Sequence, residues 1–218
     1  MKETSLHAVL KDLYTHEGDH QEALVDGYIV DVVSHDLLIE IQTRNFSAIK
    51  KKITSLVNHH KIQLVHTIPR EKWIVYLPSG ESDSILRRKS PSHGRIEDIF
   101  RELIRFPELM ILPNFSIEIL ITREEEIRID DGKGSWRRKG ISIIDRRLIE
   151  IEDRFHFATP EELLKLIPDS LPQAFTNQDL AKKLRISRNL ATRMTYCFVK
   201  MGVLSIQGKQ GRYLLYAR

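Results

Sequence analysis

Cysteine is almost absent from this chain of 218 residues, because Cys197 is the only one. An internal disulfide and a cysteine-rich zinc site are therefore excluded. No apolar run approaches the roughly 18–20 residues that a membrane-spanning helix needs. The first residues also lack an apolar stretch followed by a small-residue cleavage site. We accordingly expect a protein that makes no membrane contact and resides in the cytoplasm.

Several common catalytic signatures are missing as well. No glycine-rich phosphate loop is present, so ATP use is not expected. The glycines at 132–134 and Ser79-Gly80 match neither a dinucleotide fingerprint nor a nucleophile elbow. Seven of the nine histidines lie in residues 1–78, and His16 and His20 are four residues apart. Most of them fall in expected turns or helix ends, which favours surface positions over a zinc site.

The positive charge of the chain is concentrated at its C-terminal end. Residues 169–218 contain nine lysines and arginines against two acids, whereas residues 1–78 and 79–168 have net charges of −1 and −2. A basic module beside a nearly neutral body predicts a polyanionic partner, and nucleic acid is the first candidate.

Hydrophobic periodicity divides the chain into four parts. Residues 1–78 predict a helix, three strands, a second helix and two more strands, at 5–14, 22–25, 27–33, 37–42, 46–58, 62–68 and 73–77. Residues 78–94 hold two prolines, two glycines and five serines, which indicates a linker over 79–94. Residues 95–158 predict an α+β middle region with a helix at 95–105 and strands at 116–122, 126–130, 141–144 and 147–151. Residues 159–218 form the last unit.

This last unit resembles a winged helix-turn-helix domain. Helices are expected at 160–166, 177–184 and 187–201, with Thr159 as the first N-cap, and a hairpin is expected around residues 208–211. The resemblance implies a recognition helix and a basic wing that contact DNA. The expected contact residues are Arg188, Asn189, Thr192, Arg193, Lys209 and Arg212. A solvated basic face, or a surface for protein partners, is the alternative.

Two acids interrupt apolar strands in the first unit. Asp31 lies within IVDVV and Glu40 within LLIEIQ. A carboxylate buried in a sheet costs several kcal/mol unless it is paired or binds a cation. If the strands pair around the turn at 34–36, Asp31 lies nearly opposite Glu40, and Gln42 shares the face of Glu40. Two carboxylates at one point predict a Mg²⁺ site.

The order of helix, three strands, helix and strand around Asp31 and Glu40-Ile41-Gln42 resembles the PD-(D/E)XK nuclease superfamily. This resemblance implies a mixed-sheet α/β, restriction-endonuclease-like domain at 1–78. It also implies that Asp31, Glu40 and the Ile41 carbonyl bind Mg²⁺ or Mn²⁺. Gln42 replaces the usual lysine and would orient the attacking water, leaving a 5′-phosphate.

Further site residues follow from the same resemblance. Glu3 is the expected additional acid, with Glu22 as second choice and Asp26 as a spare. The cations expected to hold backbone phosphates, if they are more than a solvated face, are Arg44, Lys50, Lys51 and Lys52.

These features predict a Mg²⁺-dependent deoxyribonuclease, with RNA open as an alternative substrate. Nucleases that cut both strands are often dimers, so a homodimer is also open. The second hypothesis is a catalytically inactive, nuclease-like DNA-binding regulator or scaffold, which Gln42 favours. The third is an interaction module of a larger defence or repair complex, contacted through residues 79–168.

Overall fold

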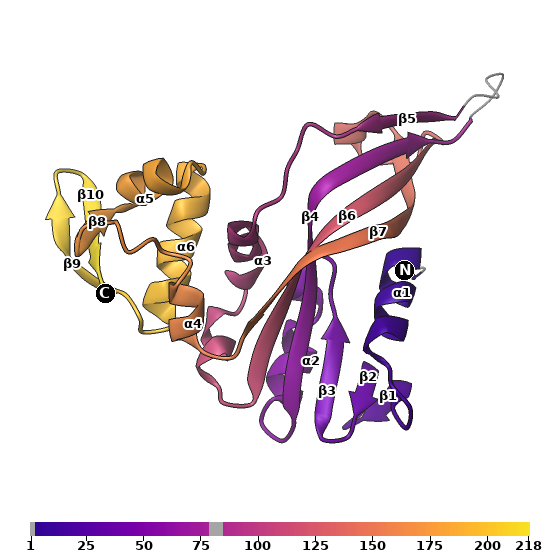
Figure 1. Cartoon of the computed structure of the whole chain (residues 1–218), viewed down its shortest axis with the longest axis horizontal. Coiled ribbons are helices and arrows are strands. Elements are labelled where there is room, and N and C mark those ends of the chain that lie inside the picture. Colours follow the sequence, from indigo (N-terminus) through magenta and orange to yellow (C-terminus); the bar gives the residue numbers. More distant parts are fainter. Residues whose placement is uncertain (1–2, 79–84) are drawn as a thin grey trace.

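The computed structural model describes residues 3–78 and 85–218 and has a mixed α/β architecture (Figure 1). A seven-stranded mixed sheet has the strand order β1-β2-β3-β4-β6-β7, with β5 added to β4. A second, three-stranded sheet has the order β8-β10-β9. No helix in the described ranges is long and apolar enough to cross a membrane.

The chain begins with a helix and an antiparallel meander. Helix α1 (Ser5–Tyr14) starts at Thr4, whose hydroxyl accepts a hydrogen bond from the His7 backbone N–H. The meander consists of β1 (His20–Val25), β2 (Tyr28–Ser34) and β3 (Leu37–Ile41). Asp26 and Gly27 both have positive φ in the first turn, the backbone that a tight hairpin requires. The predicted pairing of β2 with β3 is confirmed.

The two faces of the sheet are covered by different helices. Leu6 and Leu10 of α1 pack against one face, where Val32 and Val65 are also buried. Helix α2 (Lys50–Leu56) and the 3-10 turn Phe46–Ala48 before it cover the other face. The expected helix at 46–58 is therefore shorter and is preceded by a 3-10 turn. Because both faces are apolar, a charged group within β2 or β3 is forced into a dry environment.

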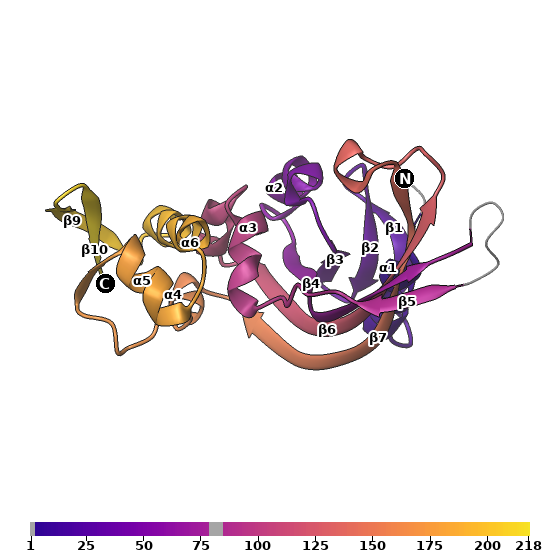
Figure 2. The same cartoon turned by 90° about the horizontal axis from the view of Figure 1, so that it is seen from above.

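Three long strands form the rest of the sheet, namely β4 (Lys61–Tyr76), β6 (Phe115–Asp130) and β7 (Ile141–Phe157). Strand β4 runs parallel to both β3 and β6, and β7 is antiparallel to β6. Figure 2 shows how strongly these strands curve. The expectation of two short strands in each of these segments is wrong. The polar residues that suggested breaks coincide with register shifts at Pro69/Glu71 and Arg123/Glu124, where the strand continues through a bulge.

The middle region is part of the same sheet. Strand β5 (Leu86–Lys89) pairs with β4, so residues 86–89 of the expected linker at 79–94 form a strand, while residues 79–84 lie outside the described residues. The sheet is followed by short helical segments, namely Ile96–Ile99, α3 (Phe100–Leu103) and Pro107–Ile111. The division we placed at residue 78 therefore runs through a continuous sheet.

The C-terminal part contains three helices and the small antiparallel sheet. Its elements are α4 (Pro160–Leu164), β8 (Ala174–Thr176), α5 (Asn177–Leu184), α6 (Arg188–Lys200), β9 (Ser205–Gln210) and β10 (Tyr213–Ala217). The predicted N-cap is confirmed, because the Thr159 hydroxyl accepts a hydrogen bond from the Glu162 N–H. Thr176 caps α5 together with Asp179, and Ser187 caps α6.

A shared core joins the C-terminal part to the large sheet. Phe100 of α3 and Phe198 of α6 are both fully buried, and their ring centroids are 5.0 Å apart. The same hydrophobic cluster includes Leu64 of β4 and Leu190 of α6. The two parts are therefore packed together through α3 rather than connected by the chain alone.

Replacing Phe198 with alanine should lower the free energy of unfolding by about 3–5 kcal/mol, because it leaves a cavity in this shared core. The control is Tyr196→Ala on the same helix, where the side chain is 45% exposed; its effect should stay within about 1 kcal/mol. Urea denaturation followed by circular dichroism measures both. Equal, small losses in the two variants would contradict the shared core.

Candidate functional site

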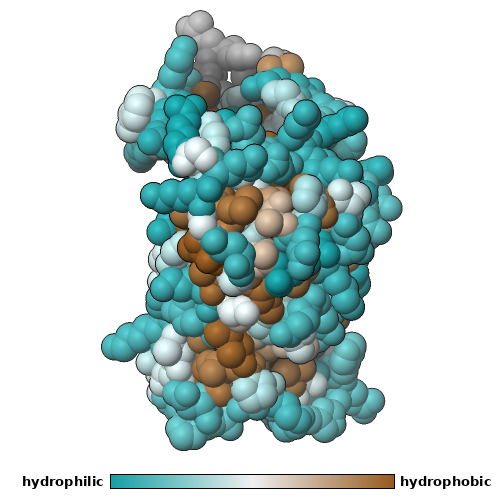
Figure 3. Space-filling model, turned by 90° about the vertical axis from the view of Figure 1, so that its left-hand side faces the viewer, coloured by the Kyte–Doolittle hydropathy of each residue, from teal (hydrophilic) through white to brown (hydrophobic). Residues whose placement is uncertain are grey.

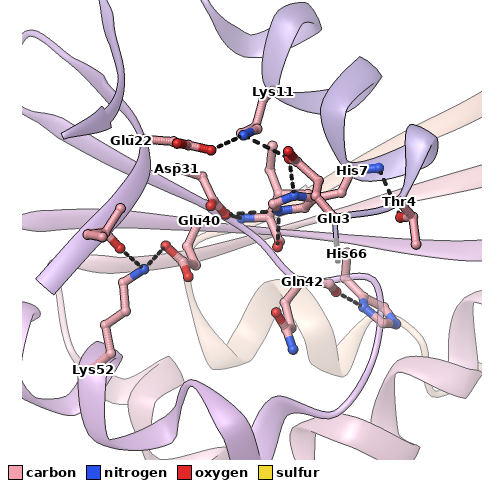
Figure 4. A network of polar contacts seen from close by, with 12 residues as sticks. Glu3, Thr4, His7, Lys11, Glu22, Asp31, Glu40, Gln42, Lys52 and His66 are labelled. Atoms are coloured by element: carbon pink, nitrogen blue, oxygen red, sulfur yellow. Dashed lines mark hydrogen bonds and ion pairs between the residues drawn. The ribbon is translucent and has the colours of Figure 1, made fainter. Parts of the chain in front are cut away.

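Asp31 and Glu40 are brought together by the pairing of β2 with β3. Val32 lies opposite Ile39, and continuing this register places Asp31 opposite Glu40. The Ile41 backbone N–H donates a hydrogen bond of 2.7 Å to Asp31 Oδ2. Glu40 is only 5% exposed. The predicted convergence of two carboxylates with the backbone of Ile41 is therefore present (Figure 4).

The two carboxylates have opposite pKa shifts. Burial raises the pKa of Glu40 to about 7, the charge of Asp31 adds to this effect, and Lys52 opposes it. Burial also acts to raise the pKa of Asp31, but hydrogen bonds from His7 and from the Ile41 N–H outweigh it, so the pKa is lowered. At neutral pH one carboxylate is charged and the other is partly protonated. Two neighbouring carboxylates thus differ in charge because His7 contacts Asp31 and Lys52 contacts Glu40.

His7 of α1 is a member of the site that sequence reasoning missed. Its Nε2 lies 3.2 Å from Asp31 Oδ2 and 3.1 Å from the Ile41 carbonyl oxygen, and its Nδ1 lies 2.8 Å from Glu3 Oε1. The hydrogen bond to Asp31, opposed by burial and aided by Glu3, raises the pKa of His7 to about 8. The spacing of Glu3 and His7 on one helical face was the only signal that could have identified it.

The remaining acids are arranged around Lys11. This lysine is 5% exposed, and its Nζ lies 2.7 Å from Glu3 Oε1 and 2.5 Å from Glu22 Oε1. Glu3 and Glu22, the two candidates for the additional acid, therefore lie beside the site, and both contact Lys11. Asp26 does not, because its carboxylate contacts His60 in the turn between β1 and β2, at 2.8 Å.

The three lysines of α2 point to different places. Lys52 turns toward the site, where its Nζ donates to Glu40 Oε2 and to the Ile29 carbonyl oxygen. Lys50 donates to the Arg105 carbonyl oxygen at 2.8 Å, and Lys51 is exposed. A common phosphate-binding row on this helix is not formed, because successive residues of a helix point about 100° apart.

Gln42 supports the turn after β3. Its side-chain amide donates to the carbonyl oxygens of Arg44 and Asn45, the second at 3.1 Å. Its backbone carbonyl lies 2.5 Å from Nδ1 of His66, a buried histidine whose pKa is lowered by burial. Its expected role in orienting water stays a prediction.

Two cavities adjoin at this turn. One, of about 360 Å³, is lined by Glu3, His7, Ile41, Gln42 and Arg44, among others. The other, also about 360 Å³, shares Thr43 and Arg44 with the first and extends along β4 to Lys72, His93 and Arg101. Burial, together with the nearby charges of Arg146 and Arg138, lowers the pKa of Arg44. The turn after β3 therefore lies between a cavity with Glu3 and Glu22 in its lining and one that mixes Arg44, Lys72 and Arg101 with Asp98 and Glu102.

A separate basic surface lies on the C-terminal part. The guanidinium groups of Arg188 and Arg212 lie over the ring of Tyr213, at 5.4 and 5.2 Å from its centroid. Asn189 and Lys209 are exposed. These four expected contact residues are open to solvent near the hairpin of β9 and β10.

Two other expected contact residues are used within the protein. Arg193 Nη1 donates to the Arg101 carbonyl oxygen at 3.2 Å, so this side chain faces α3 rather than the outer surface. The Thr192 hydroxyl, although exposed, is hydrogen-bonded to the Arg188 carbonyl oxygen and to Asn177.

Figure 3 looks onto the C-terminal part and shows hydrophobic side chains within a hydrophilic surround. On its hairpin, Ile206 and Leu214 are 50% and 38% exposed. The basic surface is thus mixed with apolar area.

The donor atoms fit a hard divalent cation. Mg²⁺ is usually bound through one or two carboxylates and keeps several waters, and Asp31, Glu40 and the Ile41 carbonyl offer such oxygens. Within the described residues, no group of three or more His, Cys, Asp or Glu is arranged to hold a metal. His7 and Lys52 occupy the oxygens of Asp31 and Glu40 instead. A metal would therefore have to displace these contacts.

Comparison with known proteins gives two matches. The model of a family described as "Domain of unknown function (DUF8091)" matches residues 4–158. An uncharacterized protein of Treponema pallidum (strain Nichols) is 31% identical over 219 residues, which cover 100% of this chain and 86% of that protein. No solved structure matches.

The contact of His7 with Asp31 should make stability depend on pH. A folded-state pKa of about 8 against an ordinary value of 6.5 stabilises the fold fully below about pH 6.5 and loses this effect as the pH rises through 8. The difference in unfolding free energy between wild type and His7→Ala should shrink by about 2 kcal/mol from pH 6 to pH 9. Denaturant titrations at both pH values measure it; a difference that stays constant would contradict a charged His7.

Proposed function

The chain belongs to the DUF8091 family, and we propose that it is a metal-dependent nuclease that hydrolyses phosphodiester bonds of DNA. The observation that carries this proposal is the convergence of Asp31, the buried Glu40 and the backbone of Ile41 beside a cavity that Ile41 and Arg44 line. A protein gains nothing in stability from a buried carboxylate whose pKa is raised to about 7. Sites with such shifts are more often functional.

The topology supports the proposal. Helix α1, three antiparallel strands, helix α2 and a strand parallel to β3 follow one another in the order that the PD-(D/E)XK resemblance implies. Asp31 on β2 and Glu40 on β3 hold the positions that the resemblance assigns to metal ligands. We therefore propose a restriction-endonuclease-like fold for the large sheet and its helices.

Metal binding would involve a small set of side chains. Asp31, Glu40 and the Ile41 carbonyl would hold Mg²⁺ or Mn²⁺, and His7 would either release these oxygens or add its own nitrogen as a ligand. When bound, such an ion stabilises charge on the phosphate and lowers the pKa of water. Glu3 and Glu22, held by Lys11, lie next to this position and would keep its potential negative.

We propose that Lys52 takes the role of the lysine that the motif usually contains and that Gln42 replaces here. Its ammonium group lies 2.5 Å from Glu40, although it comes from α2 rather than from the end of β3. In this proposal Lys52 supplies the positive charge beside the scissile phosphate, and Gln42 holds the turn that carries Arg44. The reaction forms one bond between phosphorus and a water oxygen and breaks one bond between phosphorus and an ester oxygen.

We propose a winged helix-turn-helix for the C-terminal part, where it would bind the substrate. Helices α5 and α6 are joined by a turn in which Arg185 has positive φ, and the hairpin of β9 and β10 follows. Arg188 and Arg212 on the exposed surface are suited to phosphate contacts. The cytoplasmic location stays a prediction.

A second candidate function is a DNA-binding regulator or scaffold without catalysis. Lys52 and His7 already neutralise Glu40 and Asp31, so the site is satisfied without a metal. The exposed Ile206 and Leu214 on the hairpin favour protein contacts. A cleavage assay with the wild type and Glu40→Gln separates the two functions.

Replacing Glu40 with glutamine should lower Mg²⁺-dependent cleavage of labelled DNA more than roughly 100-fold, since even outer-shell changes at metal sites cost 10–100-fold. The fold should survive, because the glutamine amide keeps an oxygen that can accept the hydrogen bond from Lys52. Cleavage is measured on single-stranded, duplex and branched DNA and on RNA, with Mg²⁺, Mn²⁺ or EDTA.

The matched control is Glu17→Gln, an exposed acid between α1 and β1. It should cleave like wild type. Full activity of Glu40→Gln would refute the site. DNA binding without cleavage by the wild type on every substrate would favour the regulator or scaffold.

The C-terminal surface should bind DNA with a strong salt dependence. In EDTA, Arg188→Ala should reduce the slope of log K against log[salt] by about 1, as expected for one phosphate contact. Lys165→Ala removes an exposed cation from the end of α4 and should leave the slope unchanged. Fluorescence anisotropy of a labelled duplex measures both. A slope in Arg188→Ala that equals those of Lys165→Ala and the wild type would argue for a protein-binding surface.

A further inference from the structure

Trp136 stands out because its side chain is 83% exposed. It lies in the turn between β6 and β7, at the start of a 3-10 segment, Trp136–Arg138. The only other tryptophan, Trp73, is covered by the guanidinium of Arg87, 4.0 Å above its ring. An open indole leaves a large apolar surface in water, which a binding partner can cover.

The turn that presents Trp136 is a specific structure. The Gly134 N–H donates to the Gly140 carbonyl oxygen at 2.6 Å, and the Lys139 N–H donates to the Trp136 carbonyl oxygen at 3.0 Å. A Cβ on Gly134 would lie 1.9 Å from the Ile141 carbonyl oxygen, so only glycine fits there. These contacts therefore fix the backbone conformation of the turn that presents the indole.

Four cations lie within three residues of Trp136 in the sequence, namely Lys133, Arg137, Arg138 and Lys139. The guanidinium of Arg137 lies 5.5 Å from the centroid of the Trp136 ring. The neighbouring Asp131 carboxylate is engaged by the Lys133 N–H and the Ser142 hydroxyl. A flat aromatic face among cations suits a ligand with a flat ring and phosphates, which is a nucleotide strand.

The turn lies at the same end of the molecule as the candidate site. In Figure 1 the turn between β6 and β7 lies beyond the N-terminal end of α1, the helix that carries His7. The Ser5 hydroxyl of this helix donates to Asp145 of β7, at 2.6 Å, which fixes the helix against the strand that leaves the turn. The charge of Arg138 also reaches Arg44, which lines the site cavity.

We propose that the Trp136 turn binds a nucleic-acid strand by stacking an unpaired base on the indole, with phosphates held by Arg137, Arg138 and Lys139. This inference rests on the proposed function and narrows its substrate class, because a stacked base must leave the duplex. Substrates would carry a single-stranded or distorted segment next to the scissile bond. A membrane surface fits less well, since Trp136 is the only apolar side chain of residues 130–140.

Intrinsic fluorescence tests the stacking without any cleavage. The full chain carrying Trp73→Phe leaves Trp136 as its sole tryptophan, and it is titrated in EDTA with short oligo(dT) and with a duplex of equal length. Single-stranded DNA should quench Trp136, and the duplex should quench it less. Trp136→Ala should weaken oligo(dT) binding roughly 5- to 100-fold, as base–aromatic stacking predicts, whereas Trp136→Phe should retain most of the affinity.

The outcomes are separable. Unchanged Trp136 fluorescence with every nucleic acid, or quenching only by vesicles of phosphatidylcholine and phosphatidylserine, would overturn the inference. Equal quenching by the duplex and the single strand would contradict the requirement for an unpaired base. Quenching by oligo(dT) in a protein that cleaves nothing with Mg²⁺ would keep the stacking turn and reject the nuclease.

Discussion

The burial of Glu40 close to Asp31 is the constraint on which the rest of the site depends. The hairpin register fixes both carboxylates, and the apolar cover on both faces of the sheet removes the water that would otherwise solvate them. The two charged side chains that contact these carboxylates stabilise them in the absence of water. Lys52 reaches Glu40 from α2, and His7 reaches Asp31 from α1. Two helices on opposite faces thus converge on one pair of charges.

The local part of this arrangement could be predicted from the sequence. The alternation of residues around the turn at 34–36 fixed the pairing of β2 with β3 and so placed Asp31 near Glu40. The cap at Thr159 follows from the same kind of local chemistry. Such features depend on residues a few positions apart, where hydrogen-bond geometry leaves few options.

The long-range part could not be predicted. Bulges carry β4 and β6 through polar stretches that resemble strand ends, and only ladder partners from distant residues show that the strand continues. The role of His7 depends on where α1 docks, and that of Lys52 on the rotation of α2. Arg193 was placed on an outer face because its partner, the Arg101 carbonyl, is 92 residues away.

The packing of Phe100 against Phe198 has a consequence for any partner that touches both ends of the molecule. A flexible tether would let the C-terminal part reach many points along a strand, whereas a shared core allows one separation. A cavity lined by Arg44 of the turn after β3 and by Arg101 of α3 lies between the candidate site and this core. The distance between the segment of a partner bound by the C-terminal part and the position of Glu40 would then be constant. The packing of α3 against α6 would set it, and the sequence of the partner would not.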